Sequence, residues 1–190
     1  MNAPLNPPAS AYFFGASEEA EQRATLAVLV DNEPGVLARV IGLFSGRGYN
    51  IESLTVSETE HEAHLSRITI VTKGTPKVLS QIKAQLGRLV VVHKVVDLTR
   101  TAFEMGHEKP IERELALVKV VNEGANRLES LRLAESFDAN VVDATTAHFV
   151  FELTGRTRKI EQFIAILAPL GLVEVVRTGV AALNRGAAGL

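Results

Sequence analysis

The hydrophobic residues in the first half of the chain follow two patterns, apolar runs of strand length and stripes that repeat at helical spacing. Residues 26–30 form an apolar run typical of a buried strand. Apolar side chains then recur every three or four positions between Val36 and Phe44. In order, the pattern predicts a strand at 26–30, a helix from about 34 to 44, two strands flanking a polar turn at 58–63, a helix at about 76–88 and a strand at 90–96.

The second half of the chain repeats this order of elements with little shared sequence. It predicts a strand at 114–121, a helix at 125–137, a hairpin of 139–143 with 147–153, a helix at about 157–167 and a strand at 173–177. This order is that of a ferredoxin-like unit, an antiparallel sheet covered by helices on one face. We therefore predict an α+β protein with two tandem ferredoxin-like βαββαβ domains.

Changes in composition indicate the boundaries of the two predicted domains. Residues 1–23 are rich in alanine and proline and then in glutamate, which is typical of a disordered N-terminal extension. Residues 100–113 turn polar and include one glycine and one proline, as a linker would. The predicted domains span 24–99 and 114–185, and we expect the glycine-rich residues 185–190 to form a loose tail.

Length, charge and cysteine content restrict the classes of function. The chain has 190 residues, 46% of them apolar, and a net charge of −2 without a basic cluster, which disfavours nucleic acid as the main partner. The absence of cysteine excludes disulfides and thiolate chemistry and suits a reducing cytosol. Because the apolar runs have strand length, we expect no membrane span and no signal peptide, and a soluble, cytoplasmic protein.

The glycine turn between the first strand and the first helix has the geometry of a small anion-binding site. A helix that begins near Pro34 leaves the amides of Gly35, Val36 and Leu37 without partners inside the helix. The helix dipole adds partial positive charge at the same place, so a carboxylate or a phosphate could satisfy these amides. A plain turn whose amides face water is the other interpretation of this segment.

The residues around this turn carry a specific family resemblance. The run LVDNEPGVLARVIGLFSGRGYNIESL, residues 29–54, closely resembles the N-terminal ACT domain of the regulatory (small) subunit of acetolactate synthase (acetohydroxyacid synthase). Generic ACT domains share the turn and its glycine, but they seldom have the continuation GYNIESL at 48–54. Residues 112–120 and 173–179 resemble the second domain of the same family, so the resemblance extends over about residues 24–185.

The resemblance implies a regulatory role without catalysis in this chain. In the family, the small subunit activates the catalytic large subunit and makes it subject to feedback inhibition by valine, in the biosynthesis of valine, leucine and isoleucine. The resemblance places thiamine diphosphate, magnesium and FAD in the large subunit and no cofactor in this chain. The alternative is a free-standing ACT-domain amino-acid sensor that regulates a different enzyme.

A homodimer joined through the ACT domains is expected as well. A unit of about 75 residues with helices on one face leaves its other face and its edges open, which favours pairing. In the family, the branched-chain amino acid binds in a pocket shared between two chains. This effector-binding role transfers to the positions that match the motif here, namely Asn32, Gly35, Val36, Asn50 and Ile51.

Motifs for catalysis and metal binding are weak or absent. The sequence contains neither a glycine-rich phosphate loop nor a Gly-x-Ser-x-Gly elbow, so we expect no catalytic residues. His61 and His64 are the best metal candidates, and an enzyme built on them is a distant alternative. They fall in what reads as a solvated polar turn, so we expect no metal site. We expect His93 to be partly buried or interfacial, and His148 has no evident serine or aspartate partner for a triad.

Polar residues on two predicted strands could form a contact surface for a partner protein. Five positions share the sheet face away from the helices: Ser53, Thr55, Ser57, Arg67 and Thr69. This face is either exposed to water or a contact surface for another protein, which the resemblance identifies with the large subunit. The charged run Glu112-Arg113-Glu114 reads most simply as solvated surface at the start of a strand.

Overall fold

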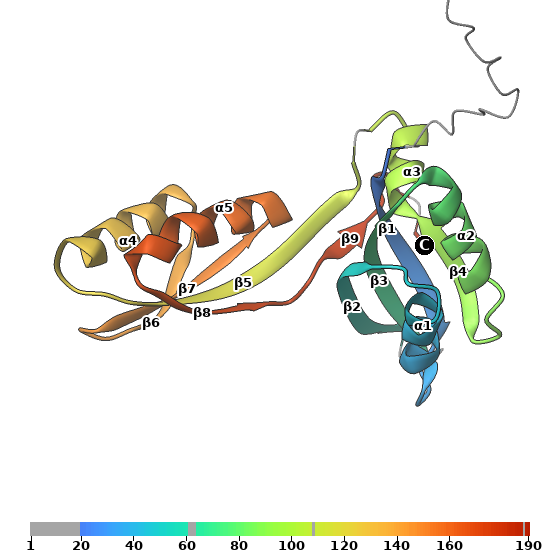
Figure 1. Ribbon diagram of the computed structural model, residues 1–190, viewed down its shortest axis with the longest axis horizontal. Helices are drawn as coiled ribbons and strands as arrows, with labels where there is room; N and C mark the ends of the chain where they lie inside the picture. The colour runs from blue at the N-terminus through green and yellow to red at the C-terminus, as the bar shows by residue number, and fades with distance from the viewer. Residues whose placement is uncertain (1–19, 61–63, 108, 188) are drawn as a thin grey trace, which may run out of the picture.

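Two lobes make up the computed structural model, which describes residues 20–60, 64–107, 109–187 and 189–190 (Figure 1). Each lobe contains an antiparallel sheet with two helices packed on one face. The strands and helices occur in the order strand, helix, strand, strand, helix, strand in both lobes. The predicted α+β class with two ferredoxin-like βαββαβ units in tandem is therefore confirmed.

The N-terminal lobe is built around β1, the strand that the apolar run predicts. The sheet order is β2-β3-β1-β4, so β2 and β4 form its edges. Leu26, Val28 and Val30 of β1 are fully buried in the core formed with α1 and α2. The elements of this lobe are β1 (Gln22–Asp31), α1 (Val36–Ser45), β2 (Ile51–Glu60), β3 (Leu65–Gly74), α2 (Pro76–Leu86) and β4 (Val92–Asp97).

The C-terminal lobe repeats this topology around a core of phenylalanine side chains. Its sheet order is β6-β7-β5-β8, and α4 and α5 cover one face (Figure 1). The Phe163 ring centroid lies 6.0 Å from that of Phe151 and 5.2 Å from that of Phe137. The elements are β5 (Ile111–Val121), α4 (Gly124–Ser136), β6 (Asn140–Ala144), β7 (His148–Gly155), α5 (Thr157–Leu167), the 3-10 helix η1 (Ala168–Leu170) and β8 (Leu172–Arg177).

Two short elements, α3 (Leu98–Glu104) and β9 (Ala181–Leu183), lie on the second face of the N-terminal sheet (Figure 1). β9 pairs with the first three residues of β5. A second apolar cluster on this face consists of Ala27, Val71, Leu98, Val180 and Ala182. The sheet face that we expected to be open is therefore covered by the chain itself, because the segment after β8 returns to the first lobe.

Two element boundaries in the first lobe differ from the predicted ones for local reasons. Residues 90 and 91, predicted as the start of a strand, belong to a turn in which the Val92 amide donates to the Leu89 carbonyl at 2.9 Å. The α3 helix occupies part of the segment predicted as a linker. Its start is fixed by the Asp97 carboxylate, which accepts a hydrogen bond from the Arg100 amide at 3.0 Å.

The two ends of the chain also differ from expectation where they are described. β1 begins at Gln22, inside the segment predicted as a disordered extension, and the prediction for residues 1–19 lies outside the described residues. The predicted loose tail makes contacts at two places. Arg185 donates from Nε to the Lys109 carbonyl at 3.3 Å, and Leu190 packs against the cluster around Ala27 and Val71.

Gly179 allows the returning segment to lie close against β2, so a side chain there should be destabilising. Its φ of +82° is in the left-handed region, and a Cβ atom would lie 2.9 Å from both Ser53 Oγ and Thr55 Oγ1. We expect Gly179→Ala to lower the free energy of unfolding by about 1–2 kcal/mol for the backbone strain, with about 1–3 kcal/mol more for the steric clash. Urea unfolding followed by circular dichroism measures this loss.

Gly106→Ala is the matched control for this substitution. Gly106 has a similar φ of +78°, but a Cβ atom there would meet nothing within 4 Å. We expect this variant to lose only the backbone contribution. Equal losses of stability in the two variants would show that the contact between Gly179 and β2 is not tightly packed.

Candidate functional site

The loop that joins β1 to α1 forms the predicted turn, and its conformation requires a glycine. Gly35 has φ 87° and ψ −10°, a left-handed conformation that other L-residues adopt only with strain. The Val36 amide donates to the Glu33 carbonyl at 3.3 Å, which closes the turn. The Asn32 amide donates to the His64 carbonyl at 2.7 Å and fixes the loop to the start of β3. The loop is therefore held at both ends while its tip is exposed.

The amides at the start of α1 form a cluster of free donors. Within the described part of the chain, the amides of Gly35, Leu37 and Ala38 have no hydrogen-bond acceptor, and no side chain caps the helix. The set differs by one position from the predicted one, because the Val36 amide is used by the turn. The first turn of α1 also contains no acidic residue. Three unpaired N–H groups and the positive end of the helix dipole therefore point toward solvent at this place.

The other two predicted site residues, Asn50 and Ile51, lie at the opposite end of the same sheet. Ile51 pairs with Thr72, and the Asn50 carbonyl accepts a hydrogen bond from Thr72 Oγ1 at 2.6 Å. His64, which holds the glycine turn, precedes the other end of β3. At the usual rise per residue, His64 and Thr72 are about 25 Å apart. A single chain thus brings Asn32, Gly35 and Val36 together but does not bring Asn50 and Ile51 to them.

The edge of the sheet next to α1 presents apolar side chains to solvent. Arg39 and Leu43 of α1 line a groove together with Gln85 of α2. Leu37 and Ile41 lie about half a turn around the helix from these two residues of α1. They therefore face away from α2, on the side of the exposed edge strand β2, and both are more than one third exposed. Val56 of β2 is exposed as well, so the apolar surface continues from the helix to the sheet edge.

The histidines differ in part from their predicted settings. His93 is exposed rather than partly buried, and its Nε2 lies 2.6 Å from Asp31 Oδ1. Residues 61–63 of the candidate metal turn lie outside the described residues. In the part of the chain that is described, no group of three or more histidine, cysteine, aspartate or glutamate side chains is arranged to hold a metal ion.

His148 has the hydroxyl and carboxylate partners that the sequence did not reveal. Its Nδ1 lies 2.8 Å from Thr145 Oγ1, and its Nε2 lies 2.8 Å from Asp143 Oδ2. The hydrogen bond from His148 lowers the pKa of the Asp143 carboxyl below its usual value. Thr145 Oγ1 also accepts hydrogen bonds from the amides of Ala147 and His148. The three side chains therefore stabilise the tip of an exposed hairpin, and Thr145 is not presented as a nucleophile.

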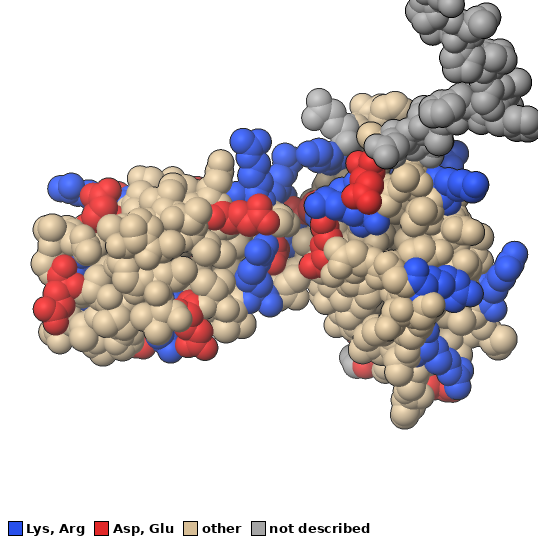
Figure 2. Space-filling view, in the orientation of Figure 1, with Lys and Arg blue, Asp and Glu red and all other residues tan. Residues whose placement is uncertain are grey.

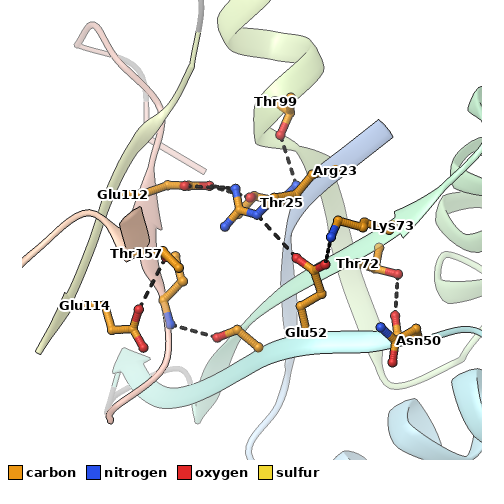
Figure 3. A network of polar contacts seen from close by, with 12 residues as sticks. Arg23, Thr25, Asn50, Glu52, Thr72, Lys73, Thr99, Glu112, Glu114 and Thr157 are labelled. Carbon is orange, nitrogen blue, oxygen red and sulfur yellow. Dashed lines mark hydrogen bonds and ion pairs between the residues drawn. The ribbon is translucent and has the colours of Figure 1, made fainter. Parts of the chain in front are cut away.

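A network of ion pairs joins the two lobes, and it is the polar feature that sequence reasoning missed (Figure 3). Arg23 of β1 contacts both carboxylate oxygens of Glu112 in β5, and Glu52 of β2 contacts Arg23 and Lys73. The hydrogen bond and the negative charge of Glu52 raise the pKa of Lys73. Charged side chains gather where the lobes meet (Figure 2).

Glu112 and Glu114 are not solvated surface, which corrects the interpretation of their charged run. Their side chains are 14% and 4% exposed. Arg177 donates to Glu114 from Nε and Nη2, both at 2.7 Å, and these hydrogen bonds raise the pKa of the guanidinium. The sequence of β5 did contain a signal for this burial. Every second residue of a strand faces the same side, and Glu112 and Glu114 share the side of the buried Ala116 and Val118.

The polar face of β2 and β3 contacts this chain's own C-terminal segment. Ser53 Oγ accepts a hydrogen bond from the Val180 amide at 2.8 Å, and Arg67 donates to the Ala182 carbonyl at 2.6 Å. Thr69 is buried, and burial lowers the pKa of Arg67. The sequence left open whether this face is exposed to water or contacts another protein. Neither interpretation describes Ser53, Arg67 and Thr69, which contact this chain or are buried in it.

Comparison with known proteins identifies the family. Residues 26–94 match the family model of the AHAS (acetohydroxyacid synthase) small subunit-like ACT domain, and residues 113–186 match that of the small subunit of acetolactate synthase. This chain belongs to the acetolactate synthase small-subunit family. The resemblance seen in the sequence is therefore confirmed, and with it the interpretation as a regulatory rather than a catalytic subunit.

Relatives in this family align with most of the chain. It is 46% identical over 165 residues to the small subunit of acetolactate synthase isozyme 3 from Salmonella typhimurium, an alignment of 86% of this chain and 96% of the relative. A probable acetolactate synthase small subunit from Archaeoglobus fulgidus is 44% identical over 162 residues, covering 85% of this chain and 96% of the relative.

The fold of the acetolactate synthase small-subunit family is also found in a solved structure. The small subunit from Thermotoga maritima superimposes with a TM-score of 0.77 at 36% identity, covering 88% of this chain and 99% of that one. Both lobes and their order therefore belong to the family. Among the helices of the described residues, none has the length and apolarity needed to cross a membrane.

The buried pair of Glu114 and Arg177 should contribute strongly to stability. We expect Glu114→Ala to lower the free energy of unfolding by about 3 kcal/mol, because the variant leaves a partly buried guanidinium without its carboxylate. Glu174→Ala, which removes the exposed partner of Lys119 in the same sheet, should change it by less than about 1 kcal/mol. Urea unfolding of both variants tests this difference, and similar losses would contradict it.

Proposed function

We propose that this chain activates the catalytic large subunit of acetolactate synthase and makes it responsive to feedback inhibition by valine. The observation that carries the proposal is the cluster of amides of Gly35, Leu37 and Ala38 at the start of α1, which have no acceptor among the described residues, in a member of the small-subunit family. The match of residues 113–186 to the small-subunit model favours this function over a free-standing ACT sensor. We expect the protein to act in the cytoplasm.

The chemistry of the glycine turn suits the carboxylate of an amino acid. Three N–H donors and the helix dipole can stabilise one negative charge without a basic side chain. The ammonium group of the ligand would lie near oxygens of the loop, and the side-chain oxygen of Asn32 is our candidate. A short aliphatic side chain would rest on apolar atoms at the rim, where Leu37 is exposed.

The pocket becomes complete only when two chains pair, and the geometry of β2 supports this arrangement. β2 is an edge strand, and an antiparallel pair of edge strands places the start of one next to the end of the other. The segment at Asn50 and Ile51 of one chain would then approach the end of the sheet that carries the partner's glycine turn. The exposed apolar residues Leu37, Ile41 and Val56 lie on the same side and would be buried in such a dimer.

The partner in the proposed function is the catalytic large subunit. We assign thiamine diphosphate, magnesium and FAD to that subunit and no cofactor to this chain, whose sequence contains no glycine-rich phosphate loop. The contribution of this chain is then purely conformational. Valine must bind two states of the assembled complex with different affinities in order to inhibit it.

Thermal unfolding in the presence of amino acids tests the effector site. At about 100 times its dissociation constant, valine should add roughly 2.7 kcal/mol of stability, which corresponds to an increase of several degrees in the unfolding midpoint. Gly35→Asp places a carboxylate where that of the ligand would bind, so the increase should vanish. Gly106→Asp is the matched control, because its φ is also positive and its surroundings are open.

Reconstitution with the large subunit tests the rest of the proposal. The wild-type chain and Gly106→Asp should raise the activity of the large subunit and allow valine to inhibit it. Gly35→Asp should raise the activity but remove the inhibition by valine. An increase in activity that is equally insensitive to valine in all three complexes would refute the feedback function and leave only activation.

Sedimentation velocity tests the proposed dimer. We expect Ile41→Glu to shift the chain from dimer to monomer, because a charge on the side of α1 next to β2 would have to be buried in the interface. Ile166→Glu on α5 is the control, since Ile41 and Ile166 are 39% and 42% exposed on their helices. A dimer that persists in Ile41→Glu would contradict pairing through this edge.

A further inference from the structure

The residue that follows the proposed pocket segment is turned toward the second lobe. The register between β2 and β3 shifts between Ile51 and Ser53, so Glu52 is the extra residue of a β-bulge. Bulges change the direction of a side chain relative to the regular strand. The Glu52 carboxylate lies 2.6 Å from Lys73 Nζ and 3.5 Å from Arg23 Nε (Figure 3). Glu52 therefore directly follows the proposed pocket segment in the chain, while its carboxylate is held by cations of β3 and β1.

Arg23 also contacts Glu112 at the start of β5. Its Nη1 donates to the two carboxylate oxygens of Glu112 at 3.1 and 3.0 Å (Figure 3). Glu112 also accepts a hydrogen bond from the buried Thr25 hydroxyl, which fixes its orientation. The side chains of Arg23, Glu52 and Glu112 are 34%, 25% and 14% exposed, so water screens them less than a surface pair.

A second contact joins the next residue of β2 to the segment that leaves the C-terminal lobe after β8. Ser53 Oγ accepts a hydrogen bond from the Val180 amide at 2.8 Å. Residues 178–180 directly follow β8, just as Glu112 stands at the start of β5. Two consecutive residues of β2 are therefore linked to both chain segments that connect the lobes, Glu52 to β5 through Arg23 and Ser53 directly to Val180.

We propose that Arg23 and Glu112 form a positioning pair that transmits effector binding to the C-terminal lobe. This inference rests on the proposed function and concerns the regulation of the same site. Valine at Asn50 and Ile51 shifts the start of β2, and with it Glu52. Arg23 shares its charge between Glu52 and Glu112, so a displaced Glu52 changes how firmly Arg23 holds the start of β5. The effector thereby biases the orientation of the C-terminal lobe toward the large subunit.

Neutral variants of the pair separate transmission from binding. In Arg23→Gln and Glu112→Gln, the affinity of the small subunit for valine, measured by titration calorimetry, should stay within about threefold of wild type, and activation of the large subunit without valine should persist. The coupling should weaken, so that inhibition at saturating valine falls by about fivefold or more, within the usual range of allosteric coupling. The double variant should lose no more than either single variant, because both remove one interaction.

Lys119→Gln and Glu174→Gln provide the matched control. They remove an ion pair that lies within the C-terminal lobe and does not join the lobes. Inhibition by valine should remain at the wild-type level in both variants. A similar decrease in all four single variants would overturn the proposal, because it would reflect loss of charge in general.

Hydrogen exchange provides a readout that a merely structural pair would not affect. In the wild-type complex, valine should change the exchange rate of the Val180 amide and of the amides at the start of β5. In Glu112→Gln, the change at the start of β5 should disappear while valine still binds. A change that persists in this variant would overturn the role of the pair.

The remaining outcomes are distinguishable from one another. Full inhibition of Arg23→Gln and Glu112→Gln overturns the positioning pair and leaves the proposed function intact. Loss of valine binding in these variants would show that the pair belongs to the pocket itself. Loss of activation in the absence of valine would show that the pair is needed for the structure of the junction. Either result overturns the proposal that the pair transmits effector binding. Absence of valine binding to the wild-type chain refutes the proposed effector and, with it, this inference.

Discussion

The face of the N-terminal sheet opposite α1 and α2 must be covered, and the way it is covered determines the rest of the architecture. Ala27 and Val71 point to that face, and the chain covers them with Leu98 of α3 and with Val180 and Ala182. A ferredoxin-like unit of this size gains little from a core on one side only, so burial on the second side adds substantially to its stability. The segment that supplies this burial comes after the whole C-terminal lobe.

The return of the chain makes the junction between the lobes more than a linker. β5 leaves the first lobe and continues as a central strand of the second, while residues 178–183 come back and pair with the start of β5. Carboxylates of Glu112 and Glu114 lie in this junction, and each is neutralised by an arginine, as buried charges require. The lobes are thus joined by the ion pair of Arg23 and Glu112 and by the hydrogen bonds of the returning segment to β2, β3 and β5.

The glycine turn and the edge strand place different requirements on the same domain. The turn needs only local structure: a left-handed Gly35, a helix that starts without a cap, and a hydrogen bond from Asn32 to hold it. Residues Asn50 and Ile51 lie at the far end of the sheet, so any pocket containing both parts requires a second chain. In the proposed function, this separation gives a physical reason for the domain to dimerise, because the ligand and the second chain would then bind at the same edge.

Local pattern was sufficient to predict both domains, their element order and the glycine turn. Hydrophobic periodicity and turn residues act over a few positions, and they gave α1, α2 and β1 within a few residues of their observed ends. The sequence also carries the family resemblance, because the run around Gly35 is contiguous. What only the tertiary structure decided depends on contacts between distant residues. These are the covering of the second sheet face, the burial of Glu112 and Glu114, and the separation of the two halves of the site. No short-range pattern records that Val180 meets Ser53, because the two residues are 127 positions apart in the sequence and only the folded topology brings them together.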